Sequence, residues 1–217
     1  MEKIKMPYSR KEELFNWISH FLGALLSVIA LISIIIYMNI KNITEYILPV
    51  SIFLLTSIIL YTMSFLYHIS NNYENKMKLR ILDHATIFLL ISGTYTPYIF
   101  IVVPFYEGYL VATFVYVISL IGIVLNIINM NNKFVKIYSY IGYVLTGWSI
   151  IFIYPIFVQN INQLSLILLF VGGIVYTLGF IFYGIGKKKK WFHFIWHIFV
   201  LLGTILHAIS ILFLIIN

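Results

Sequence analysis

The chain of 217 residues contains no cysteine, and Asp, Glu, Lys and Arg together make up only 10% of it. Without thiols, disulfide bonds and metal sites built from cysteine thiolates are excluded. With so little charge, a water-soluble domain of this size is also excluded, because roughly a quarter of its residues would be charged. What the chain has in abundance is apolar sequence, since 62% of its residues are hydrophobic and its mean hydropathy is +1.00.

The apolar residues form runs of about 20 residues, the length that an α-helix needs to cross a bilayer. They do not form the alternating ten-residue strands of a membrane β-barrel. The sequence therefore predicts an all-α, polytopic membrane protein in which residues 1–217 form a single transmembrane domain. Seven spanning helices are expected at residues 17–37, 46–68, 81–103, 109–129, 135–158, 164–183 and 192–216. The first run is too long for a signal-peptide core and lacks a cleavage site, so it is expected to stay as an anchor.

The basic residues alternate between the connections of these seven helices. Of the 14 Lys and Arg residues, 13 fall on one side of the predicted membrane and only Lys41 falls on the other. By the positive-inside rule, this bias predicts a cytoplasmic N-terminus and a C-terminus outside. The 13 residues are Lys3, Lys5, Arg10, Lys11, Lys76, Lys78, Arg80, Lys133, Lys136 and Lys187 to Lys190.

The net charge of +7 is thereby explained by membrane orientation, and nucleic-acid binding is not expected. The chain is rich in Ile, Asn and Lys but has only five alanines, which indicates AT-rich coding. A multi-pass protein of a bacterial cell membrane is the predicted localisation.

A layer of polar residues is predicted near the cytoplasmic edge of the helices. His193 and His197 are four residues apart and so share one face of the last helix. On the predicted topology, His68 at the end of the second helix and Asp83 at the start of the third lie at the same depth. Ser64 lies one turn deeper on the face of His68. Ionisable side chains are costly inside a bilayer, so these residues form a candidate functional site.

Three imidazoles at one depth match the ligand set of a catalytic zinc site, which keeps a fourth position for water. Zinc lowers the pKa of that water to about 7 and so generates a nucleophile at neutral pH. Asp83 could hold the water and act as general base, or it could orient a histidine ligand. A lone histidine in a membrane helix is more often a hydrogen-bonding residue, but three beside Asp83 favour a metal site.

The other three histidines are expected to lie outside this ligand set. His84 follows Asp83 and is expected at the membrane interface. His20 lies near the cytoplasmic end of the first helix, where a structural hydrogen bond is expected. His207 is about 15 Å deeper than His197 along the helix, too far to share an ion, so a packing or proton-relay role is expected.

Several short motifs resemble those of the hemolysin III family, which belongs to the superfamily of progestin and adiponectin receptors and is related to alkaline ceramidases. The resemblance covers essentially the whole chain. The motifs are Glu13-Leu-Phe-Asn-Trp-Ile-Ser-His20, Ser64-Phe-Leu-Tyr-His68, Leu82-Asp83-His84-Ala85, Ser92-Gly-Thr-Tyr-Thr-Pro97 and His193-x3-His197-x9-His207.

This resemblance implies a seven-helix bundle with an intracellular N-terminus and a zinc ion held by His68, His193 and His197. It also implies that Asp83 contacts the metal-bound water and that Ser64 lies nearby. His84 is usual in the bacterial branch of the superfamily and not in the receptors. Together with the short N-terminal segment, it favours the bacterial branch over receptor signalling.

Three functions follow as hypotheses. The first is a zinc-dependent hydrolase of a lipid amide or ester, with membrane lipids as partners and an acyl chain admitted into the bundle. The second is a non-enzymatic membrane-homeostasis or sensor protein in which zinc locks the helices together. The third, a pore-forming cytolysin, follows the family's name, but the sequence shows neither a soluble form nor an amphipathic pore-lining segment.

Overall fold

A computed structural model of the protein describes residues 8–103 and 105–216. These residues form helices and no strand, and seven helical segments are long and apolar enough to cross a membrane. The prediction of an all-α, seven-span membrane protein is confirmed. The helices are α1 (Arg10–Lys41), α2 (Ile47–Ile69), α3 (Tyr73–Val102), α4 (Phe105–Asn129), α5 (Lys133–Trp148), α6 (Tyr154–Asn160), α7 (Gln163–Gly186) and α8 (Phe192–Ile216). Two 3₁₀ helices, η1 (Thr44–Tyr46) and η2 (Ser149–Ile153), precede α2 and α6, so that α5, η2 and α6 together make the fifth span.

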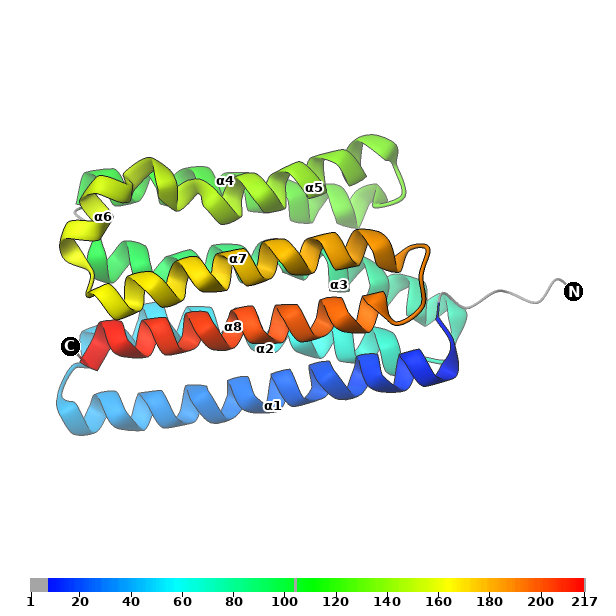
Figure 1. Ribbon diagram of the computed structural model, residues 1–217, viewed down its shortest axis with the longest axis horizontal. Helices are drawn as coiled ribbons and strands as arrows, with labels where there is room; N and C mark the ends of the chain where they lie inside the picture. Colours follow the sequence, from blue (N-terminus) through cyan, green and yellow to red (C-terminus); the bar gives the residue numbers. More distant parts are fainter. Residues whose placement is uncertain (1–7, 104, 217) are drawn as a thin grey trace, which may run out of the picture.

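Consecutive spans run in opposite directions, so that α1 begins at one end of the bundle and α8 finishes at the other (Figure 1). Helices α1, α2 and α3 pack in sequence order, and α4 and α5 follow beside α3. The last helix, α8, returns to contact α1, α3 and α7. This return brings the start of α8 close to residues from the first three helices. Large apolar side chains such as Ile29, Ile36 and Leu120 are exposed on the outside, where a bilayer would cover them.

The end of the bundle at which α1 begins carries every described Lys and Arg except Lys41, and we call it the basic end. Lys3 and Lys5, which also support the predicted orientation, lie outside the described residues. The other end of the bundle, where α1 finishes and α2 begins, is called the opposite end. That the basic end faces the cytoplasm stays a prediction.

The third helix begins earlier than the sequence indicated. It starts at Tyr73 rather than near residue 81, because the Asn72 side chain accepts a hydrogen bond from Asn75 N at 3.0 Å and caps the helix. The charges on Lys76 and Lys78 led to the prediction of a loop here. A helix can nevertheless continue beyond the apolar layer, and Asp83 consequently lies about three turns inside α3 rather than at its start.

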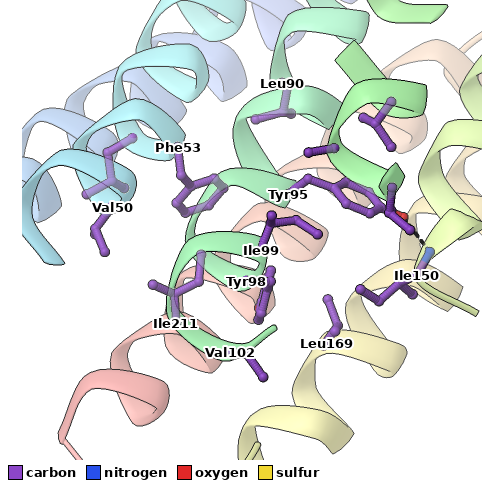
Figure 2. Packing of buried hydrophobic residues seen from close by; sticks show 14 of the residues in the cluster. Val50, Phe53, Leu90, Tyr95, Tyr98, Ile99, Val102, Ile150, Leu169 and Ile211 are labelled. Atoms are coloured by element: carbon purple, nitrogen blue, oxygen red, sulfur yellow. Dashed lines mark hydrogen bonds between the residues drawn. The ribbon is translucent and has the colours of Figure 1, made fainter. Parts of the chain in front are cut away.

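The apolar core is most continuous toward the opposite end (Figure 2). This core brings together side chains of three helices, namely Phe53 of α2, Tyr98 of α3 and Ile211 of α8, all of which are buried. Tyr95 of α3 supports the irregular fifth span, because its hydroxyl accepts a hydrogen bond from Ile150 N at 2.9 Å. A backbone N–H that leaves the helical pattern inside a membrane needs such a substitute partner.

Candidate metal centre

Three buried histidines converge near the basic end. His68 lies in the last turn of α2, and His193 and His197 lie in the first two turns of α8. The Nε2 atom of His193 is 3.1 Å from that of His197 and 3.3 Å from that of His68. One ring nitrogen from each of the three lies within 4.8 Å of the others, which makes the group a possible metal site.

The contacts of Nδ1 in His68 and His197 show which ring nitrogen of each imidazole carries the proton. His68 Nδ1 lies 2.6 Å from Glu13 Oε2, and because a carboxylate only accepts, Nδ1 donates. His197 Nδ1 donates to the backbone oxygen of Asn16 at 3.2 Å. A neutral imidazole that donates from Nδ1 carries a lone pair on Nε2. Two lone pairs therefore face His193 Nε2, where a single N–H could satisfy only one of them.

A metal ion would satisfy all three nitrogens at once. Zinc binds histidine nitrogen at about 2.0–2.1 Å, so two ligands of a tetrahedral shell are about 3.4 Å apart. The separations of His193 Nε2 from the other two Nε2 atoms, 3.1 and 3.3 Å, fit that spacing, and all three ligand atoms lie within 4.8 Å of one another. Neutral imidazole also suits copper, iron and nickel. The donor set therefore supports a transition metal, with zinc among the ions that fit.

Ser64 and Asp83 open onto a small cavity beside the three histidines. The cavity has a volume of about 30 Å³ and is lined by both residues together with His193 and His197. This is room for at least one water molecule, which needs about 10–15 Å³. Ser64 reaches the cavity from α2 and Asp83 from the third turn of α3. The two side chains predicted to accompany the histidines therefore face the same space.

Glu13 and Lys76 belong to the centre and were not predicted. Glu13 Oε1 lies 3.0 Å from Lys76 Nζ, while its Oε2 accepts from His68. Lys76 is only 1% exposed, and its Nζ also donates to the backbone oxygens of Tyr67, His68 and Ser70. These carbonyls end α2, where no intrahelical donor is left for them. Lys76, expected in a loop, instead ties the end of α2 to Glu13.

A signal for Glu13 was present in the sequence. Glu13, Asn16 and His20 recur at helical spacing and predict one polar stripe along the first helix. The expected start at residue 17 left Glu13 outside the helix. In the structure α1 begins at Arg10, because Ser9 and Glu12 form a capping box, and the stripe faces the histidines.

The remaining histidines have separate surroundings. His20 stacks on His197 with ring centroids 3.7 Å apart, and the expected structural hydrogen bond to either of its nitrogens is not found within the described residues. His84 lies between α3 and α7, with Nε2 3.1 Å from the Tyr183 hydroxyl and Nδ1 3.3 Å from Asp83 Oδ2, and its place at the membrane interface stays a prediction. His207 Nε2 donates to Leu169 O at 3.1 Å, a contact of the packed α7–α8 pair.

Tyr8, just before α1, covers the centre on the side of the basic end. Its ring lies nearly parallel to that of His193, with centroids 4.5 Å apart. Burial raises the pKa of the Tyr8 phenol above its usual value, so the hydroxyl is neutral at physiological pH.

A larger cavity adjoins the small one on the side away from Tyr8. It has a volume of about 140 Å³ and a mostly apolar lining from α2, α3, α5, α7 and α8. Leu60, Ile87, Trp196 and Val200 line both cavities, so the larger space continues from the histidines toward the middle of the bundle.

Comparison with known proteins identifies relatives of this chain. The family model described as "Haemolysin-III related" matches residues 8–208. The chain is 32% identical over 209 residues to "Hemolysin-3" of Bacillus cereus, covering 96% of this chain and 94% of that protein. It is 34% identical over 206 residues to "Hemolysin-3 homolog" of Bacillus subtilis (strain 168), covering 95% of each. With a family match that spans the metal centre and all but the last turns of α8, this multi-pass membrane protein belongs to the hemolysin III family.

Proposed function

We propose that the protein is a zinc-dependent hydrolase of a lipid amide or ester, with its metal centre near the cytoplasmic face of the membrane. The observation that carries this proposal is the meeting of three Nε2 atoms beside a cavity that also receives Ser64 and Asp83. A closed structural zinc site would use four protein ligands. Three histidines with a water-sized space next to them leave a position for a reactant.

The metal is proposed to be held by His68, His193 and His197. When bound, zinc would polarise a carbonyl group and make water nucleophilic at neutral pH. Glu13 and the backbone of Asn16 hold the Nδ1 atoms of two ligands, which keeps their Nε2 atoms aimed inward. These contacts fix the geometry before any substrate binds.

Asp83 is proposed as the general base and Ser64 as a donor to the carbonyl oxygen. Asp83 would take one proton from the attacking water and return it to the departing amine or alcohol as the C–N or C–O bond breaks. Ser64 Oγ–H would donate to the oxygen on which negative charge builds up. One water is consumed, and a carboxylic acid and an amine or alcohol are released.

The adjoining cavity of about 140 Å³ suits the acyl chain of such a substrate. Its walls are mostly apolar, and it begins at the side chains that also line the small cavity. A chain lying there would leave its carbonyl group at the histidines. Lipid substrates present this combination of an apolar tail and a nearby amide or ester.

Turnover of defined lipids by the purified, zinc-loaded protein tests the proposal. Ceramides and phospholipids are offered, and release of free fatty acid is measured by mass spectrometry. Asp83→Asn is expected to lower the rate by about 100-fold or more, in the range of losing a general base. Glu74→Gln, which removes an exposed carboxylate of the same helix, serves as the matched control. Equal rates for wild type and Asp83→Asn would remove the hydrolase proposal.

A second candidate is a non-enzymatic membrane protein in which the metal locks the helices. It is favoured by one observation: the ligands come from α2 and α8, while Glu13 and Asn16 of α1 hold two of them. A bound ion would thus connect three helices. In that case, chelation lowers the melting temperature, no lipid is cleaved, and Asp83→Asn leaves both metal content and stability unchanged.

Cytolysis is a third proposal, motivated only by the name "Hemolysin-3" of the Bacillus cereus relative. Red-cell lysis by purified protein, rising with its concentration and absent from detergent-only controls, tests it directly.

The proposed orientation has its own test, which the absence of cysteine makes simple. Single cysteines are introduced as Lys188→Cys at the basic end and Asn160→Cys at the opposite end, both exposed positions. A membrane-impermeant thiol reagent on intact cells is expected to label only Asn160→Cys. Labelling of Lys188→Cys instead would reverse the orientation.

A further inference from the structure

A third cavity lies at the basic end, on the outer side of the metal centre. It has a volume of about 270 Å³ and a mixed lining that is more polar than that of the apolar cavity. His84, Tyr183 and His193 line both this cavity and the small one beside the histidines. The three cavities therefore follow one another, from the basic end past the metal centre and into the apolar interior.

Three cations from three parts of the fold line this third cavity. They are Arg80 of α3, Lys136 of α5 and Lys187, which directly follows α7. No Asp or Glu contributes to its lining among the described residues. Arg80 is only partly exposed, yet it forms no ion pair within residues 8–103 and 105–216. The cavity therefore concentrates positive charge without an internal counterion.

The neighbouring lysines differ from these three cations, because each is either paired with a carboxylate or lies outside the cavity. Lys76 is neutralised by Glu13, and Lys78 pairs with Glu74 in solvent at 2.7 Å. Lys133, one turn before Lys136, is exposed and does not line the cavity. The positive-inside rule accounts for basic residues at this end of the bundle. It does not account for three of them lining one cavity.

Phenol groups hold one of the cations, Lys187, in place without cancelling its charge. Lys187 Nζ donates to the Tyr140 hydroxyl at 2.6 Å and lies over the rings of Tyr140 and Tyr183 at 4.5 and 5.0 Å. Aromatic rings attract a cation but leave its net charge available to a ligand. Tyr8 and Tyr67 complete the wall and can donate hydrogen bonds to an anion.

We propose that this cavity binds a phosphate group, and that the phosphate is the headgroup of the lipid on which the metal centre acts. Guanidinium binds phosphate oxygens in a two-point geometry, and lysines add point charges around them. The order of the cavities then matches the order of groups in a phospholipid: phosphate, ester carbonyl and acyl chain. The substrate assignment rests on the proposed hydrolase function, whereas phosphate binding does not.

Calorimetric titration of the purified, metal-loaded protein in a nonionic detergent tests phosphate binding. The ligands are dihexanoyl phosphatidate, dihexanoylglycerol and inorganic phosphate. Phosphatidate is expected to bind at least about tenfold more tightly than dihexanoylglycerol, which lacks the charged hydrogen bonds of the phosphate. It is also expected to bind at least about tenfold more tightly than inorganic phosphate, which lacks the acyl chains that would enter the apolar cavity. Equal binding of dihexanoylglycerol would overturn the phosphate site. Equal binding of inorganic phosphate would overturn its assignment to a lipid headgroup.

Matched variants separate this cavity from general surface charge. Arg80→Gln and Lys136→Gln are each expected to weaken phosphatidate binding about tenfold. Lys78→Gln and Lys133→Gln remove the same charge nearby and are expected to change it less than about twofold. Lys136 is exposed, so its variant is informative even where Arg80→Gln does not fold. Equal weakening by all four variants would overturn the proposal.

Asp83→Asn distinguishes the failure of this proposal from failure of the hydrolase function. It removes the proposed general base but none of the cations that line the third cavity. Phosphatidate binding by this variant, unchanged from wild type, supports the phosphate site whether or not any lipid is cleaved. If ceramide were cleaved without any preference for phosphatidate, the hydrolase function would stand, but the assignment of the phosphate to the headgroup of the substrate would be overturned.

Discussion

The two ends of the bundle are held together by different interactions. At the opposite end, Phe53, Tyr98 and Ile211 pack in an apolar core, and the polar contacts are neutral, such as the 2.7 Å hydrogen bond from Tyr98 to Ser210. At the basic end, His68 and the ion pair of Glu13 with Lys76 occupy the equivalent buried space. Both ends join α2 and α3 to their neighbours, but only one does so with ionisable groups.

This difference indicates what the ionisable groups are for. The opposite end shows that these helices can be joined by packing and neutral hydrogen bonds alone. Buried ion pairs are weak evidence for stability, because removing two charges from water costs about as much as their attraction returns. The contrast therefore supports the proposed role of the three histidines in metal binding, beside the ion pair through which Lys76 joins the end of α2 to Glu13. Variants at the two ends should accordingly separate metal affinity from stability.

The largest effect is expected from His197→Ala, which removes one of three ligands from the basic end. Apparent zinc affinities of about 10–16 kcal/mol for four-ligand sites correspond to roughly 2.5–4 kcal/mol per ligand, or about 60-fold to several hundredfold in affinity. Metal content, measured by mass spectrometry after gel filtration, is expected to fall from about one ion per chain to near zero. His207→Ala, on the same helix but outside the ligand group, should retain the ion. Retention by both variants would contradict the three-histidine site.

Phe53→Ala tests the other half of the comparison. Phe53 is 1% exposed, and its truncation leaves a void of roughly 100 Å³, which costs about 2–3 kcal/mol through lost packing. No transfer from water is involved, because lipid is as apolar as the core. Unfolding in mixed micelles should show this loss while metal content stays unchanged. Leu55→Ala on the lipid-facing side of α2 is the control, with little expected effect. A loss of metal in Phe53→Ala would mean that the two ends are not independent.

Glu13→Gln addresses the basic end without touching a ligand. The carboxylate accepts from His68 Nδ1 at 2.6 Å, and loss of such an outer partner typically lowers metal affinity by 10–100-fold. Competition with a zinc chelator of known affinity measures the change. Glu74→Gln, an exposed carboxylate that pairs only with Lys78 in the described structure, should leave it unchanged. Equal affinity for Glu13→Gln and wild type would reduce Glu13 to a structural partner of Lys76.

The sequence predicted the features that depend on composition and on helical spacing. Hydropathy located the seven spans because each must match the thickness of a bilayer. The four-residue spacing of His193 and His197 placed them on one face, and the alternation of charge put His68 at the same end. Ser64 followed from helical geometry as well. These inferences needed only the position of each residue along one helix.

The features that were not predicted depend on where helices end and on which faces meet. The start of α3 was placed too late because Lys76, Lys78 and Arg80 read as a loop. Glu13 lay outside the expected first helix, so its contact with His68 could not be inferred. The third cavity combines residues from most of the helices, and no spacing within one segment encodes it. Because charged residues at the membrane edge were interpreted as loop, both the start of α3 and the buried contact of Glu13 with His68 were missed.

The smallest expected effect, and the sharpest test of the comparison, is that of Tyr98→Phe at the opposite end. The variant keeps the ring in the core and removes only the hydroxyl that donates to Ser210 Oγ. Hydrogen bonds between membrane helices contribute about 0.6 kcal/mol on average, because the unfolded chain in the bilayer finds other partners. Unfolding in mixed micelles should detect a loss of this size, whereas Tyr106→Phe, at a position that is 71% exposed, should show none. A loss above about 2 kcal/mol would show that polar contacts, and not packing, hold the opposite end, so that the contrast between the two ends would no longer identify the basic end as the functional one.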